Sequence, residues 1–200
     1  MTKRTRSFSG SLMFDDETRD ALYLNVGRCL SAWNQVEDQI LHLTQFALEA
    51  GGHRDATFAA GYWMVVSFDA RLKLCNAMIS YALRGSRNED FKLRWDTLNN
   101  RSHAKSRKRA EIAHGSVVVT RERDQDQFHA YFFPYYHKRQ FDHHASGGFW
   151  KGESFSGTTK HLRVEDLQNI AAAFNRLRDD IAELQSDWVK RDILAKDGEQ

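Results

Sequence analysis

The chain has 200 residues, 41% of them hydrophobic and 28% charged, and its formal net charge is +2. This composition is that of an ordinary soluble globular protein, and the length suits one domain. The net charge is too small to indicate a nucleic-acid-binding protein unless cations cluster locally. No apolar run approaches the roughly 18 residues that a bilayer-spanning helix requires, so we expect no transmembrane segment.

Residues 1–14 are basic and rich in Ser, and we expect a flexible lead-in to the folded domain. Its cations are not followed by an apolar segment, so we expect no secretory signal. Cys29 and Cys75 lie on apolar helix faces and do not form a metal-binding pair. Buried, reduced thiols in a cytoplasmic protein are the simplest explanation.

The first long helix is expected to begin at Asp15 or Asp16, either of which can cap it, and to end at Ala50 before two glycines. Its apolar residues recur at steps of three and four, which is the spacing of one helix face. The members of this face are Leu22, Val26, Cys29, Trp33, Val36, Ile40 and Leu43. Glu37 stands one position off the face, and we favour a solvent-exposed carboxylate over one that faces a functional site.

Residues 53–64 form a connector to which the sequence assigns no structure. Ser67 can cap a second helix, which we expect over 68–82. A third helix is expected over 88–114, because its apolar residues share one face in its first half. Gly115 is expected to end it by adopting the left-handed conformation.

After Gly115 the pattern changes from that of helices to that of strands. Short β-branched and aromatic runs at 116–120 and 128–133 predict a hairpin, and 135–160 reads as a long loop. A last helix is expected over 165–190, followed by a polar tail over 191–200. The predicted fold is therefore a mainly α, four-helix bundle-like domain over 15–190, with the hairpin and loop of 116–160 inserted before the last helix.

The second half of the third helix is strongly basic. It places five cations within nine positions and no acid among them: Arg101, Lys105, Arg107, Lys108 and Arg109. Cations near the end of a helix suit its dipole, and that alone could explain them. The segment closes on Ile112-Ala113-His114-Gly115, which separates Arg109 from His114 by four residues.

This spacing and ending resemble the Arg-(four to six residues)-His motif of the HEPN superfamily, whose members are small all-α domains and include many metal-independent ribonucleases. Arg107 also satisfies the motif. Trp33-Asn-Gln-Val36-Glu37 resembles a "W-x-x-V-E" pattern on the first helix of several HEPN-like families, and 68–73 resembles another of their segments. Ala110 departs from the pattern, because members often carry Asn or another polar residue there.

The resemblance implies an endoribonuclease that needs no metal or other cofactor. Arg109 and His114 are its candidate catalytic residues, and Glu37 and Glu111 are candidate supporting residues. The candidates for RNA binding are Arg101, Lys105, Arg107 and Lys108. One such His per chain leaves an acid–base pair incomplete, so we expect a homodimer with a composite site. A toxin or phage-defence effector restrained by an antitoxin or regulatory partner protein fits this expectation.

Two other functions stay open on the sequence. One is a non-catalytic HEPN-like module that binds a nucleotide, a nucleic acid or an acidic protein through the basic helix end. The other is a helical scaffold whose function lies in the loop 135–160. Five histidines after residue 128 could suggest zinc, but they lack a metal-binding spacing, so we expect no metal site.

Overall fold

The computed structural model describes residues 16–50, 57–84, 88–121, 128–134 and 161–197. In chain order these residues form α1 (Asp16–Ala50), α2 (Thr57–Met64), α3 (Phe68–Ala82), α4 (Glu89–Ala113), β1 (Ser116–Arg121), β2 (Phe128–Phe133) and α6 (Val164–Asp197). The prediction of a mainly α fold with a hairpin before the last helix is confirmed. The lead-in over 1–14 and the loop 135–160 lie outside the described residues.

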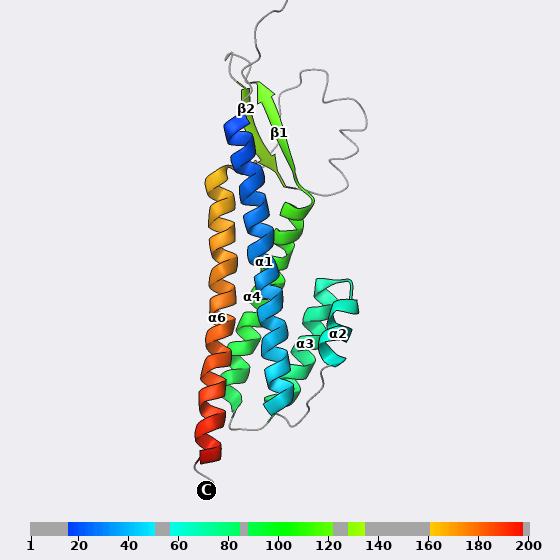
Figure 1. Cartoon of the computed structure of the whole chain (residues 1–200), viewed down its shortest axis with the longest axis vertical. Helices are drawn as coiled ribbons and strands as arrows, with labels where there is room; N and C mark the ends of the chain where they lie inside the picture. Colours follow the sequence, from blue (N-terminus) through cyan, green and yellow to red (C-terminus); the bar gives the residue numbers. More distant parts are fainter. Residues whose placement is uncertain (1–15, 51–56, 85–87, 122–127, 135–160, 198–200) are drawn as a thin grey trace, which may run out of the picture.

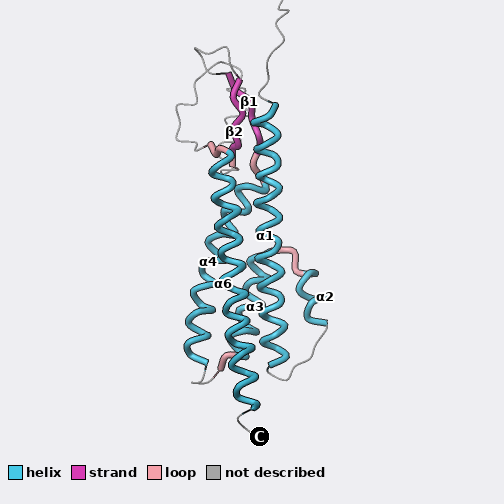
Figure 2. The backbone as a smooth tube through the Cα atoms, turned by 60° about the vertical axis from the view of Figure 1, so that its left-hand side comes forward, coloured by secondary structure: helices cyan, strands magenta, loops and turns pink. Residues whose placement is uncertain are grey.

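The long helices α1 and α6 run side by side in the same direction, and α4 packs against them in the opposite direction (Figures 1 and 2). Helices α2 and α3 lie beside one half of this bundle, and the hairpin lies at its other end (Figure 1). None of the helices in the described residues has an apolar stretch long enough to cross a bilayer.

The core forms where the apolar faces of the helices meet. Trp33 of α1 is fully buried, and its ring packs edge-on against Phe68 and Phe174, with centroids 4.9 and 5.2 Å apart. The first and last helices are therefore in contact in the core. Cys29 and Cys75 are free and buried, as expected, and burial raises the pKa of each thiol to about 11.

Helix α3 begins where the sequence predicts. The Ser67 side chain accepts a hydrogen bond from the backbone N–H of Ala70, which caps the helix. Helix α2, in contrast, occupies most of the connector that received no assignment. Its eight residues carry apolar and small side chains all round, so they show no helical period, and tertiary contacts decide its structure.

Helix α4 also matches its prediction, with Asn88 and His114 as its flanking residues. Its buried face continues into the basic half, since Ser102 and Ile112 are both buried. The explanation for Gly115 is wrong, however, because its backbone is not in the left-handed conformation. A Cβ at Gly115 would lie 2.7 Å from the carbonyl oxygen of Phe133 and would clash with the Phe132 ring. Close packing against β2 is therefore what favours glycine here.

The hairpin pairs β1 and β2 in antiparallel register, from Ser116 opposite Phe133 to Arg121 opposite Phe128. Phe132 is buried and exchanges backbone hydrogen bonds with Leu162, at 3.0 and 2.7 Å. This bridge ties the hairpin to the residues just before α6. The second strand and its end before Pro134 agree with the prediction.

Helix α6 continues to Asp197, so the predicted polar tail over 191–200 is wrong for residues 191–197. One reason is that contact with α4 persists beyond Lys190, because Arg191 pairs with Asp90 at 3.0 Å. The next residues, Ile193-Leu194-Ala195-Lys196, include good helix formers, which favours continuation of the helix.

Candidate functional site

The cations of residues 101–109 have different surroundings. Arg101 reaches across to α6 and pairs with Asp180 at 2.6 Å. Lys108 pairs with Glu111 along the same helix at 2.7 Å, whereas Arg107 is exposed. Burial, with smaller contributions from Arg101 and Arg176, lowers the pKa of Lys105. The basic segment is therefore not one uniform surface for RNA.

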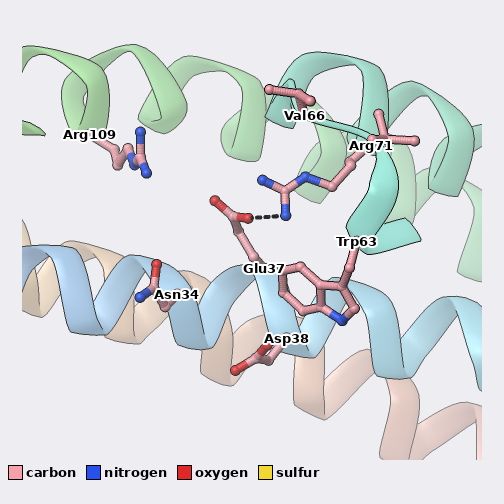
Figure 3. A pocket seen from close by; sticks show the side chains of 8 residues that line it. Asn34, Glu37, Asp38, Trp63, Val66, Arg71 and Arg109 are labelled. Carbon is pink, nitrogen blue, oxygen red and sulfur yellow. Dashed lines mark ion pairs between the residues drawn. The ribbon is translucent and has the colours of Figure 1, made fainter. Parts of the chain in front are cut away.

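Arg109 is the member of this segment that faces a pocket. The pocket has a volume of about 600 Å³ and lies between α1, α4 and the region where α2 leads into α3 (Figure 3). Its lining residues are Asn34, Glu37, Asp38, Trp63, Val65, Val66, Arg71 and Arg109. The Nε of Arg109 is buried and has no hydrogen-bond partner among the described residues. Because this Nε is enclosed by the protein, an anion in the pocket would be bound by the terminal nitrogens of the Arg109 guanidinium.

Glu37 lines the pocket and is 5% exposed, so the expectation of a solvent-exposed carboxylate is wrong. One carboxylate oxygen accepts a hydrogen bond from Trp33 Nε1 at 2.5 Å, and the other pairs with Arg71 Nη1 at 2.8 Å. The Tyr62 hydroxyl donates to the Glu37 backbone carbonyl at 3.3 Å. The carboxylate is buried because it has partners on both oxygens, which offsets the cost of removing it from water.

Arg71 of α3 stands opposite Arg109 in the pocket (Figure 3). Its ion pair with Glu37 positions it, and its guanidinium lies 5.3 Å from the ring centroids of both Tyr62 and Trp63. Like Arg109, it has a buried Nε with no partner among the described residues. The pocket thus holds two guanidinium groups, one of them already neutralised by a carboxylate.

The first turn of α3 is also tied to α4, by a contact between side chains that do not line the pocket. His103 Nε2 lies 3.1 Å from Asp69 Oδ1, and Asp69 also pairs with Lys73 at 2.7 Å. The hydrogen bond from Lys73, with a smaller contribution from His103, lowers the pKa of Asp69.

His114 does not line this pocket. It is the residue that ends α4, it is exposed, and its backbone N–H donates to the Ala110 carbonyl at 3.2 Å. Five positions along an α-helix correspond to a net rotation of about 140°, which directs His114 and Arg109 to different sides. A single chain therefore does not bring the two motif residues into one pocket. Glu111 also lies outside the pocket, beside Lys108.

Of the eight residues that line the pocket, only Glu37 and Arg109 were predicted as site residues, and the polar or aromatic residues missed include Arg71, Asn34 and Trp63. Arg71 lies in a segment with a noted family resemblance, but its role required the position of Glu37. Asn34 is three residues before Glu37, so helical spacing alone could have placed both on one face. Trp63 lies in the connector that received no assignment, and no signal in the sequence identifies it.

Among the described residues, no group of three or more His, Cys, Asp or Glu side chains is arranged to hold a metal ion. His137, His143 and His144 lie outside those residues. Comparison of the chain with models of known protein families, with curated proteins and with solved structures found no match. The function is therefore inferred from the chain's own residues.

Proposed function

We propose that this protein is a HEPN-type endoribonuclease that works without a metal, with Arg109 and His114 as its catalytic residues. The observation that carries the proposal is the position of Arg109. The motif's arginine faces an open pocket, and its Nε has no partner among the described residues. Arg101, in the same basic segment, is instead paired with Asp180.

The proposed reaction needs only groups that the chain supplies. The ribose 2′-hydroxyl attacks the adjacent phosphorus, and the bond from phosphorus to the 5′-oxygen breaks. A base takes the proton of the 2′-hydroxyl and an acid protonates the departing 5′-oxygen, which leaves a 2′,3′-cyclic phosphate. A histidine can serve in either role near neutral pH, and the Arg109 guanidinium can stabilise the charge that develops on the phosphate.

The reaction requires one acid and one base, whereas each chain contributes a single His114. We therefore include a two-fold homodimer in the proposal, in which both copies of His114 reach one cleft and Arg109 holds the phosphate. The exposure of His114 at the end of α4 is compatible with such a site. Arg107, which is exposed, then guides RNA towards it through salt-dependent phosphate contacts. Lys108 and Arg101 contribute less, because they are paired with Glu111 and Asp180.

The test is RNA cleavage by the purified wild-type protein in EDTA, compared with His114→Ala and with His103→Ala as a matched control. His103 is another exposed histidine of the same helix and is not part of the proposed site. We expect His114→Ala to lower cleavage by about a hundredfold or more. His103→Ala should retain the wild-type rate, and the product should carry a cyclic phosphate.

Wild-type cleavage by His114→Ala, or loss of activity in EDTA, would contradict the site assignment. Light scattering gives a second check, since a chain that remains monomeric at micromolar concentration while it cleaves RNA would exclude the composite site.

A second function is favoured by the position of His114 outside the pocket. If His114 only ends α4, the pocket with its two arginines binds the phosphate of a nucleotide or nucleic acid without reaction. This non-catalytic module predicts RNA or nucleotide binding that depends on Arg109, no cleavage by the wild type, and no effect of His114→Ala on affinity.

A further inference from the structure

Trp63 differs from the other tryptophans in the described residues. Trp33, Trp95 and Trp188 are buried in the core, at 0%, 0% and 6% exposure, whereas Trp63 is 52% exposed. It lies near the end of α2, and its indole forms one wall of the pocket that Arg109 faces (Figure 3). A large aromatic side chain that is half in water contributes less to the core and keeps part of its ring surface accessible to a ligand.

The exposed indole of Trp63 is held in place by contacts with Tyr62 and Arg71. Its neighbour Tyr62 is fully buried and donates a hydrogen bond to the Glu37 carbonyl, which anchors the end of α2 to α1. The Tyr62 and Trp63 rings meet edge to face, with centroids 5.0 Å apart. The guanidinium of Arg71, itself paired with Glu37, lies 5.3 Å from the Trp63 ring centroid. The indole is therefore positioned in advance, with part of its surface open to the pocket.

We propose that Trp63 is a stacking platform for one unpaired base, so that the pocket takes a nucleotide of single-stranded RNA with its phosphate towards Arg109. This inference rests on the proposed function and names its substrate class. Every base has a π-face that can stack on an indole, and a guanidinium binds a phosphate through paired N–H groups. Both kinds of group line the same pocket, and neither alone distinguishes RNA from other anions.

The dimensions and the remaining lining residues agree with this ligand. A pocket of about 600 Å³ is within the range of small-molecule sites, which suits one nucleotide and not a duplex. Val66, which is 96% exposed, adds an apolar side chain to the lining of the pocket. The Asn34 amide points towards the space that Arg109 faces, whereas Asp38 points away from it (Figure 3). Asn34 can therefore donate to or accept from a base edge or a ribose hydroxyl.

Single strands are the form of RNA that such a site selects. In a duplex each base is already stacked between its neighbours and paired, so it cannot lie on a protein side chain without being extruded. The site should therefore discriminate by strandedness more than by sequence, since stacking tolerates all four bases.

The experiment measures the binding of a fluorescent 12-nucleotide RNA by anisotropy. The binding protein carries His114→Ala, so that no cleavage interferes. Trp63→Ala and Trp63→Phe are added separately to this background, and Tyr81→Ala is the matched control. Tyr81 is an aromatic residue of α3 with 54% exposure that does not line the pocket. Circular dichroism melting checks that each variant is folded.

We expect Trp63→Ala to weaken binding by about tenfold or more, the usual scale for losing one base–aromatic stack, and Trp63→Phe to weaken it less. Tyr81→Ala should bind like its parent, and duplex RNA should bind more weakly than the single strand. A series of RNAs, each with one abasic position, tests the same stacking contact from the RNA side, without any substitution of Trp63. One abasic position should reproduce most of the loss seen with Trp63→Ala.

Equal binding by the parent and a folded Trp63→Ala would overturn the stacking site, as would equal affinity for single-stranded and duplex RNA. Uniform tolerance of every abasic position would do the same, whether or not Trp63→Ala folds. If RNA cleavage by otherwise wild-type protein still depends on His114 and Arg109, only the stacking site fails and the proposed function stands. Absence of any RNA binding or cleavage by the wild type overturns both.

Discussion

Helix α4 carries arginines on the side that packs against α6 and on the side that faces the pocket, and the two sides differ in the acids that the arginines meet. Along the α4–α6 seam, Arg94 pairs with Asp187 at 2.9 Å and Arg101 with Asp180 at 2.6 Å. The two pairs are seven residues apart on both helices, as antiparallel neighbours require, so each cation meets an acid. In the pocket, Arg109 faces a carboxylate, Glu37, that is already occupied by Arg71 and Trp33.

The difference shows that the role of an arginine depends on its opposite surface more than on its position in a basic run. The seam cations are partly exposed and matched, which is the pattern of surface ion pairs that add modest stability. The pocket places a buried, satisfied carboxylate beside a guanidinium whose Nε lacks a partner.

The largest expected effect on stability is in the pocket. Glu37→Ala leaves Arg71 without its acid in a site where the Arg71 side chain is only 13% exposed. We expect the free energy of unfolding to fall by about 3 kcal/mol, because removing one partner of a buried ion pair leaves an uncompensated charge. Urea denaturation measures the change.

The matched control is Asp38→Ala, an exposed acid at the next position, which should change the unfolding free energy by less than about 0.5 kcal/mol. An equal effect of the two substitutions would mean that the Glu37–Arg71 pair contributes no more than a surface charge does.

Arg109→Ala should separate activity from stability. We expect RNA cleavage to fall by about a hundredfold, through lost stabilisation of the phosphate charge. The unfolding free energy should stay unchanged or rise slightly, because the substitution removes a buried donor that has no partner among the described residues. Cleavage kinetics and denaturation of the same preparation measure both effects.

Arg107→Ala is the control for this prediction, because Arg107 also satisfies the motif spacing but is exposed. It should weaken RNA binding and reduce its salt dependence with little effect on the rate at saturating RNA. If Arg107→Ala lowered cleavage a hundredfold while Arg109→Ala stayed active, the catalytic arginine of the motif would be Arg107 and not Arg109.

The smallest effect is expected at the seam. A double-mutant cycle of Arg101→Ala and Asp180→Ala should give a coupling energy of about 0.2–1 kcal/mol, the range measured for exposed ion pairs. The cleavage rate should be close to that of the wild type, since Arg101 is engaged with α6. A large loss of activity from Arg101→Ala alone would place the catalytic surface on the seam and not at the pocket.

Local sequence patterns predict the long helices, α3 and the hairpin, whereas α2 has no such pattern. The three- and four-residue spacing of apolar residues located α1, the first half of α4 and the core of α6, and Ser67 located the start of α3. The change to β-branched residues after Gly115 located β1. In each of these cases the residues of the segment itself indicate its secondary structure, and its apolar face packs against the adjacent helix.

Which polar residues act together depends on contacts between helices that are distant in sequence. Glu37 lies beside the apolar face in sequence, and it is buried only because Trp33 and Arg71 approach its two oxygens. Arg101 and Arg109 are equivalent as members of a basic run, but one meets Asp180 of a helix distant in sequence and the other meets a pocket. The physical reason is that the residues nearby in space decide whether a charged side chain is paired or can bind a ligand. The spacing of residues along one helix does not reveal which residues of other helices lie nearby.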